Sequence, residues 1–153
     1  MTIVSVGDKA PDFELPSDGG GRGGPKELKG KPVVLYFYPK DMTPGCTKEA
    51  QQFRDLKPAF DKASAVLVGV SKDSVKRHDN FKTKYNLNFA LVSDSDGSLC
   101  EDYGVWVKKK LYGRGYLGIE RATFLIDAKG VFRRVWRNVK GHAEEALDAV
   151  HML

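Results

Sequence analysis

Residues 33–53, VVLYFYPKDMTPGCTKEAQQF, carry the clearest structural signal in the chain. Residues 33–38 are β-branched, aromatic or leucine, have no charge and lie between two prolines, which is typical of a buried strand. After a short loop, residues 47–57 have the pattern of a helix, which Pro58 is expected to end. The segment therefore predicts a buried strand that leads through a loop into a helix.

Strands and helices alternate along most of the remaining chain. Asp73 or Ser74 is expected to cap one helix, and a turn at 127–130 is expected to join the last two strands. This order predicts an α/β fold with a central mixed sheet and helices on both faces. The other predicted strands are residues 65–71, 89–92, 122–126 and 131–136, and the other predicted helices are residues 74–85, 98–103 and 142–153.

The composition is that of an ordinary globular chain. The 153 residues are 41% hydrophobic and 29% charged, and no uncharged apolar run approaches the roughly 20 residues of a membrane span. We therefore expect a single domain over residues 1–153 and no membrane partner. The first residues lack the pattern of a signal peptide. Two cysteines 54 positions apart, neither in a CxxC pair, favour a cytoplasmic protein.

Cys46 is expected at the first turn of the helix that follows the buried strand. The unpaired N–H groups at a helix N-terminus carry about half a positive charge, which favours the reactive thiolate form of a cysteine. Ala50 and Phe53 share a helical stripe with Cys46, so we expect a partly exposed thiol in a pocket floored by apolar side chains. Position alone leaves open whether Cys46 is reactive or an inert core residue.

The segment PKDMTPGCTKEA resembles the active-site signature of the peroxiredoxins, P-x-x-x-[TS]-x-x-C, with Pro39, Thr43 and Cys46 at the fixed positions. The resemblance is greatest to the bacterioferritin comigratory protein (PrxQ) subfamily, and it extends over nearly the whole chain. The further matching segments are GDKAPDFELP (7–16), LKGKPVVLYFYP (28–39), YGRGYLGIERATFLID (112–127) and GHAEEAL (141–147).

This resemblance implies a thioredoxin-like fold and a thiol-dependent peroxidase that reduces hydrogen peroxide and organic hydroperoxides. Cys46 would be the peroxidatic cysteine, which passes through a sulfenic acid. Thr43 would offer its hydroxyl to the peroxide, and Pro39 would shield the pocket from water. Arg121 matches the family's catalytic arginine, and Glu49 matches the acid that positions it. No metal, haem or flavin cofactor is implied, because the sulfur is the redox centre.

The chain departs from the subfamily at the resolving cysteine. Many members place that cysteine five residues beyond the peroxidatic one, where this chain has Gln51, and others place it in the helix at 74–85, which contains no cysteine here. Cys100 is expected on the inner side of a short helix, packed under the sheet. Core packing is the favoured interpretation of Cys100, and a resolving role is the alternative. We therefore expect an external reductant, namely thioredoxin, glutaredoxin or a small thiol.

The charge distribution raises nucleic acid as an alternative partner. The chain carries +5 overall, but residues 104–140 contain ten basic residues against two acidic ones, a local charge of +8. Residues 105–116 interleave basic and aromatic side chains, a pattern typical of proteins that bind single-stranded nucleic acid. We favour the interpretation of residues 105–116 as a solvated loop whose aromatic side chains cover the core, with no nucleic-acid partner. We expect the protein to be a monomer. A thiol–disulfide oxidoreductase is the other alternative, which the absence of a CxxC pair disfavours.

Two weaker patterns are interpreted as structural. Gly19, Gly21 and Gly24 satisfy G-x-G-x-x-G, but the strand and helix that a dinucleotide site needs on either side are absent, which favours a surface loop. His78 shares a helical stripe with Phe81, which favours a half-buried packing residue.

Overall fold

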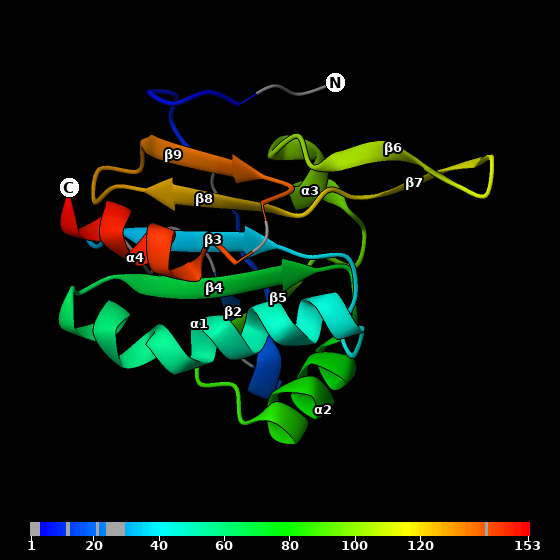
Figure 1. Cartoon of the computed structure of the whole chain (residues 1–153), viewed down its shortest axis with the longest axis horizontal. Coiled ribbons are helices and arrows are strands. Elements are labelled where there is room, and N and C mark those ends of the chain that lie inside the picture. Colours follow the sequence, from blue (N-terminus) through cyan, green and yellow to red (C-terminus); the bar gives the residue numbers. More distant parts are fainter. Residues whose placement is uncertain (1–3, 12, 21, 24–29, 140) are drawn as a thin grey trace.

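The computed structural model describes residues 4–11, 13–20, 22–23, 30–139 and 141–153, and a mixed five-stranded sheet lies at its centre (Figure 1). The three strands on one side of the sheet are parallel to one another, and the two on the other side are antiparallel to their neighbours. The strands follow the order β5 (Ala90–Ser93), β4 (Val66–Ser71), β3 (Val33–Phe37), β8 (Ala122–Ile126) and β9 (Phe132–Arg137).

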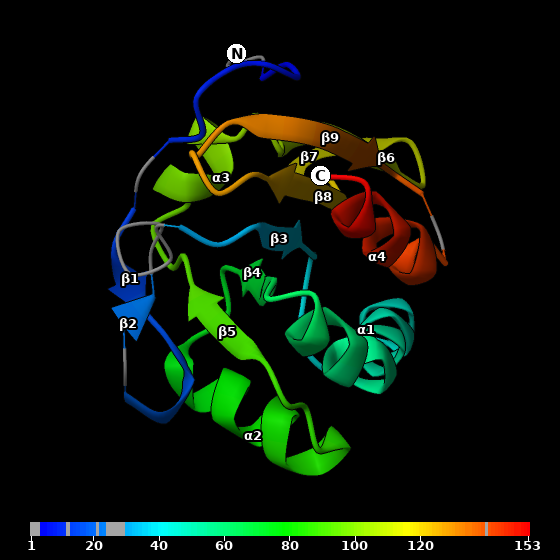
Figure 2. The same cartoon turned by 90° about the vertical axis from the view of Figure 1, so that its left-hand side faces the viewer.

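Helices cover both faces of this sheet (Figure 2). One face carries α1 (Pro44–Lys62) and α4 (Ala143–His151), which lie side by side, and the opposite face carries α3 (Ser98–Asp102). α2 (Val75–Tyr85) packs beside the edge strand β5. The predicted α/β fold with helices on both faces of a mixed sheet is therefore confirmed. Among the described residues, no helix has both the length and the apolar content that crossing a membrane requires.

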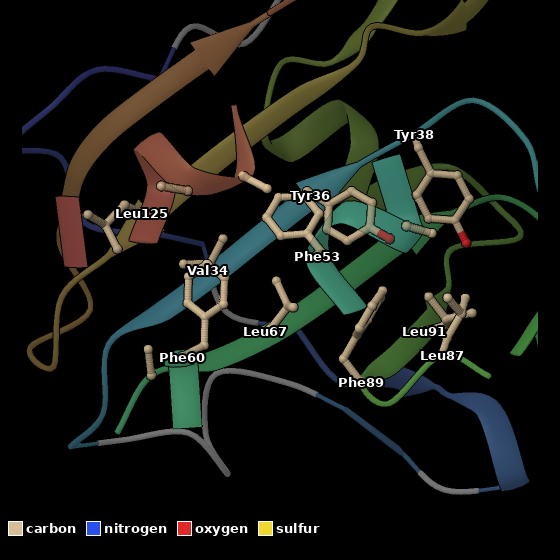
Figure 3. Packing of buried hydrophobic residues seen from close by; sticks show 14 of the residues in the cluster. Val34, Tyr36, Tyr38, Phe53, Phe60, Leu67, Leu87, Phe89, Leu91 and Leu125 are labelled. Carbon is tan, nitrogen blue, oxygen red and sulfur yellow. The ribbon is translucent and has the colours of Figure 1, made fainter. Parts of the chain in front are cut away.

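β3 contributes to two hydrophobic cores, because alternate residues of a strand point to opposite faces of the sheet. Val34 and Tyr36 belong to the cluster that includes residues of α1 and α4, and Leu35 and Phe37 belong to the cluster that includes residues of α3. The rings of Tyr36 and Phe53 stack with their centroids 4.6 Å apart, as Figure 3 shows. This contact holds the first half of α1 against the end of β3.

α1 is longer than the sequence predicted, because Pro58 lies inside the helix and does not end it. A proline in a helix interior lacks the N–H that would bond the carbonyl four residues earlier, which here belongs to Arg54. The side-chain amide of Asn88 donates to that carbonyl oxygen at 3.2 Å, so the oxygen keeps a partner. The extra turn also buries Phe60 completely. These two contacts offset the cost of Pro58 and carry the helix on to Lys62.

A hairpin, β6 (Trp106–Leu111) paired with β7 (Arg114–Ile119), projects from the body of the protein (Figure 1). Its turn consists of Tyr112 and Gly113, whose φ angles of 51° and 76° are those that a type I′ turn requires. The prediction of a loop at residues 105–116 is therefore wrong, because most of this segment belongs to the two strands of the hairpin. Tyr112 at the turn is 96% exposed and does not cover the core, whereas Trp106 at the base of the hairpin packs against the core cluster.

A second small sheet pairs β1 (Leu15–Pro16) with β2 (Arg22–Gly23) around the short helix η1 (Asp18–Gly20). Asp18 accepts a hydrogen bond from the backbone N–H of Leu91 at 2.7 Å, which ties this segment to β5. Of the glycine pattern noted in the sequence, Gly19 lies in η1, and Gly21 and Gly24 lie outside the described residues.

Two local predictions are confirmed by hydrogen bonds. Ser74 Oγ accepts from the backbone N–H of Arg77 at 3.2 Å, so Ser74 is the cap of α2. Asp127 Oδ1 accepts from the N–H groups of Lys129 and Val131 at 2.9 and 3.0 Å, which closes the turn between β8 and β9. Both side chains satisfy backbone donors that would otherwise lack a partner.

Gly69→Ala should lower the free energy of unfolding by about 1–3 kcal/mol through overpacking. A Cβ at this position in β4 would lie 3.0 Å from both Leu91 Cδ2 and Tyr36 Cζ, which is closer than carbon atoms pack. Urea unfolding followed by far-UV circular dichroism measures the change. Gly115→Ala in β7 is the matched control, because its Cβ would meet only the carbonyl oxygen of Lys109 at 4.0 Å. A Gly69→Ala variant as stable as wild type would contradict this account of the β4 packing.

Candidate active site

Cys46 lies in the first turn of α1, immediately after the loop that follows β3. Thr43 is the N-cap residue, with an extended backbone (φ −81°, ψ 151°), and Pro44 opens the helix, where a missing N–H costs no hydrogen bond. The thiol is only 2% exposed and is more buried than the sequence suggested. The partial positive charge of the helix N-terminus therefore acts on a sulfur that is shielded from water.

Arg121, the residue before β8, brings a positive charge to this sulfur. Its Nη2 donates to Cys46 Sγ at 3.3 Å, and its Nη1 donates to Glu49 Oε1 at 2.7 Å. Gly45 makes room for this approach, because a Cβ there would lie 3.3 Å from Nη2. The backbone carbonyl of Arg121 accepts from Asn138 N–H at 2.8 Å, which fixes the start of the side chain. One planar guanidinium thus bridges a thiol and a carboxylate, and it stabilises negative charge on both.

Glu49 lies three residues after Cys46 on the same side of α1, and its side chain is buried. Burial raises the pKa of Glu49 to about 7, and the charge and hydrogen bond of Arg121 partly oppose that shift. The carboxylate therefore depends on Arg121 for its charge near neutral pH, and in turn it holds the guanidinium in place over the sulfur.

A cavity of about 350 Å³ opens beside Glu49 and Arg121, and Gly45, the residue before Cys46, also lines it. It has space for hydrogen peroxide or a small organic hydroperoxide, and its rim is partly charged. The residues that line it are Gly45, Lys48, Glu49, Gln52, Arg121 and Gly141.

Thr43 and Pro39 lie in the loop that leads to Cys46. Thr43 Oγ donates its hydrogen to the carbonyl oxygen of Lys40 at 2.8 Å, which leaves the oxygen lone pairs of the hydroxyl as acceptors. Pro39 is half-buried two residues after the end of β3. The structure therefore brings Cys46, Arg121 and Glu49 into one hydrogen-bonded group and places Thr43 and Pro39 in the adjoining loop.

Cys100 lies on α3 and is completely buried. It belongs to the hydrophobic cluster on one face of the sheet, whereas Cys46 belongs to the cluster on the other face. Asp94 accepts from the backbone N–H of Cys100 at 2.8 Å. Burial, followed by the neighbouring Asp94 carboxylate, raises the pKa of the Cys100 thiol well above its usual range. Cys100 is therefore a neutral thiol, separated from Cys46 by the sheet.

Sequence reasoning missed two polar side chains buried below the site. The Tyr36 hydroxyl has no hydrogen-bond partner among the described residues, and burial, with smaller effects from Glu49 and Cys46, raises the pKa of Tyr36. His142 Nε2 lies 2.6 Å from Thr123 Oγ1, and burial lowers the pKa of His142. Both groups are therefore neutral near pH 7. Tyr36 and Thr123 are opposite each other across β3 and β8, and a polar group inside each apolar strand was the available signal.

Comparison with known proteins identifies relatives along nearly the whole chain. Residues 6–135 match the AhpC/TSA family. The chain is 56% identical over 146 residues to a putative peroxiredoxin bcp of Coxiella burnetii, which covers 94% of this chain and 97% of that protein. It is 51% identical over 152 residues to peroxiredoxin Bcp of Bacillus subtilis, which covers 98% of this chain and 96% of that protein.

Solved structures give the same result. Xanthomonas campestris peroxiredoxin Q superposes with a TM-score of 0.87 at 47% identity, over 92% of this chain and 90% of that one. A cysteine-to-serine variant of Xylella fastidiosa PrxQ superposes with a TM-score of 0.93 at 39% identity, over 99% of this chain and 98% of that one. The resemblance noted in the sequence and the thioredoxin-like fold that it implied are thereby confirmed. The chain belongs to the AhpC/TSA family, among the Bcp and PrxQ peroxiredoxins, and is a thiol-dependent peroxidase.

Proposed function

We propose that Cys46 is the nucleophile that reduces hydrogen peroxide and small organic hydroperoxides, on a chain that forms a single domain. The observation that carries this proposal is the position of the Arg121 guanidinium, 3.3 Å from the sulfur and 2.7 Å from the Glu49 carboxylate. A related structure, of the Xanthomonas campestris bacterioferritin comigratory protein, concerns the alkyl peroxide reduction activity of that protein. Cys46 also lies at a helix N-terminus, a position that favours a thiolate, and its neighbours Gly45, Glu49 and Arg121 line the cavity.

The reaction follows from these positions. The Cys46 thiolate attacks the terminal peroxide oxygen, an S–O bond forms and the O–O bond breaks. The sulfur is oxidised to a sulfenic acid, and the leaving oxygen takes up the proton that the thiol released, so that water or an alcohol departs. Arg121 donates to the sulfur and to the oxygen that gains charge as the O–O bond stretches. Glu49 holds the guanidinium in this orientation through its 2.7 Å hydrogen bond.

Thr43 and Pro39 complete the proposed site. Because the Thr43 hydrogen is already donated to the carbonyl oxygen of Lys40, the hydroxyl oxygen is free to accept the O–H of a peroxide. Pro39 has no N–H and a fixed φ, and it limits access of water to the loop beside the cavity. Together they orient the peroxide towards the Cys46 sulfur.

We infer that the protein acts as a monomer in the cytoplasm. We also infer that an external thiol, namely thioredoxin, glutaredoxin or a small thiol, reduces the sulfenic acid. The burial of Cys100 on the opposite face of the sheet supports this inference. A disulfide needs Cα atoms within about 7 Å, so a Cys46–Cys100 bond would require both helices to leave their packing. No nucleic-acid partner is proposed, because the cavity and the hydrogen-bonded group around Cys46 account for the site.

Cys46→Ser should abolish peroxide reduction, whereas Cys100→Ser should keep the rate of the first oxidation step. Both thiols lie in the first turn of a helix, but only Cys46 accepts a hydrogen bond from Arg121, whereas burial and the Asp94 carboxylate raise the pKa of the Cys100 thiol. Stopped-flow peroxide consumption measures the rates, and a non-reducing peptide map after stoichiometric peroxide reports the product. Equal rates in the two variants would contradict the role of Cys46. A Cys46–Cys100 linked peptide in most molecules would contradict the external reductant.

Arg121→Lys should slow the attack on peroxide about 100-fold, although the charge is kept. A lysine ammonium is a point charge and cannot donate along two fixed directions to Cys46 and Glu49 at once. The measurement is the second-order rate constant with hydrogen peroxide. Arg134→Lys is the matched control, because Arg134 is half exposed and pairs with Glu145 on the surface. A rate within about threefold of wild type for Arg121→Lys would remove the guanidinium fork from the mechanism.

Glu49 should make the protein less stable as the pH rises. The pKa of Glu49 is about 7 in the folded chain against an ordinary value of 4.5, so between these values the folded state holds the proton more tightly. The protonated Glu49 side chain therefore adds up to about 3 kcal/mol to the free energy of unfolding. This stabilisation is complete below pH 4.5 and is lost as the pH rises past 7. Glu49→Gln lacks this titration. Urea unfolding at about pH 5 and about pH 8 should therefore show wild type losing stability relative to Glu49→Gln; an unchanged difference would refute the assignment.

A further inference from the structure

A second group of buried polar side chains lies beside the loop that carries the active-site residues. Asp41 belongs to that loop, His78 projects from α2, and the side chains of both are completely buried. Each carboxylate oxygen of Asp41 has its own partner: the Tyr38 hydroxyl donates to Oδ1 at 2.5 Å, and His78 Nδ1 lies 2.7 Å from Oδ2. The expectation of a half-buried packing residue at position 78 is wrong, because the His78 ring is fully buried and hydrogen-bonded.

The hydrogen bonds fix how many protons this pair holds. His78 Nε2 lies 3.0 Å from the backbone carbonyl oxygen of Val92, and because a carbonyl only accepts, Nε2 carries a hydrogen. One further proton then lies between His78 Nδ1 and Asp41 Oδ2, whichever of the two atoms holds it. The pair therefore has no net charge, which makes its complete burial tolerable.

Asp73 and Arg77 hold the backbone of the same residue. Asp73 Oδ2 accepts from Asp41 N–H at 2.7 Å and from Ser71 Oγ at 2.7 Å, and Arg77 Nη2 donates to the Asp41 carbonyl at 3.4 Å. Ligand atoms of Asp41, Asp73 and His78 lie within 4.8 Å of one another, which is close enough for a metal site. Their hydrogen bonds already account for this spacing, so the cluster is explained as an anchor for Asp41.

The anchor acts on a strained part of the chain. Met42, the next residue, has a φ of 69°, which side-chain-bearing residues rarely adopt and which the surrounding contacts must maintain. Thr43 follows directly as the N-cap of α1, and Cys46 lies in the first turn. Any change in the backbone of Asp41 therefore passes through Met42 into the residues that face the peroxide.

We propose that the Asp41–His78 pair is a positioning device for the peroxidase reaction, which sets the loop so that Thr43 and Cys46 keep their geometry with Arg121. This inference rests on the proposed role of Cys46. His78 touches none of the reacting groups and acts through its hydrogen bond to Asp41. Because misplacement by about 1 Å costs a reaction about 100-fold, a loop freed from this anchor reacts with peroxide more slowly even in a folded protein.

Two substitutions of His78 separate its two hydrogen bonds. In His78→Asn the amide nitrogen takes the place of Nδ1, so the bond to Asp41 is kept and the bond to Val92 is lost. In His78→Gln the amide nitrogen reaches the place of Nε2, so the bond to Val92 is kept and the bond to Asp41 is lost. We expect the rate constant with hydrogen peroxide to fall about 10- to 100-fold in His78→Gln and to stay within about threefold of wild type in His78→Asn.

Asp41 offers a second, independent pair. Asp41→Asn keeps a carbonyl oxygen for the Tyr38 hydroxyl and gains an N–H that donates to His78 Nδ1, so the anchor survives without the carboxylate. Asp41→Ala removes both bonds. We expect near-wild-type peroxide rates in Asp41→Asn and a loss of about 10- to 100-fold in Asp41→Ala. Rescue by the amide is the result that a mere loss of packing does not give.

All rates are measured by stopped flow at a temperature at which circular dichroism shows each variant to be folded. Asp127→Ala is the stability control, because it removes two backbone hydrogen bonds in the turn between β8 and β9, at the opposite end of β3, and should keep the wild-type rate. Equal rates in His78→Asn and His78→Gln, whether fast or slow, would overturn the positioning role. Peroxidase activity that survives in Cys46→Ser would instead overturn the proposed function, so the two failures are distinguishable.

Discussion

The hydrogen bonds of the Arg121 guanidinium to Cys46 and Glu49 are the contacts on which the rest of the site depends. They join the start of β8 to the first turns of α1, two elements far apart in the sequence. This meeting requires β8 to pair antiparallel to β3 with Ala122 opposite Phe37, which places Arg121 at the end of the sheet where β3 delivers the chain to α1. It also requires glycine at position 45. Sheet register and helix position are thus both needed for a single guanidinium contact.

The core that stabilises the fold also sets the electrostatics of this contact. The stacked rings of Tyr36 and Phe53 and the buried His142 exclude water below the site, so charges there interact through a medium of low dielectric constant. The same burial raises the pKa of Glu49 to about 7 and lowers the pKa of His142. Arg121 therefore remains the dominant charge beside the sulfur.

Sequence patterns predicted the parts of the fold that local rules control. The strand at 33–38, the cap at Ser74 and the position of Cys46 followed from hydrophobic runs, side-chain capping and helix geometry. Pro58 failed as a stop because its effect is cancelled by Asn88, thirty residues away, through a contact that no local pattern records. The burial of His78 was missed for the same reason, since its partner Asp41 lies on another element.

The loop between β3 and α1 is held from two sides, and this bears on how its sulfur is reduced. Arg121 and Glu49 fix the helix side of the loop, and the hydrogen bonds to Asp41 fix the strand side. An internal disulfide would require this loop to unwind against both sets of contacts, and the sheet separates the second thiol, Cys100, from Cys46. Cys46 is only 2% exposed, and the cavity opens beside its neighbours Glu49 and Arg121, so we infer that an external thiol approaches the sulfur from that side. The anchored loop and the separation of the two thiols therefore both support the proposed external reductant.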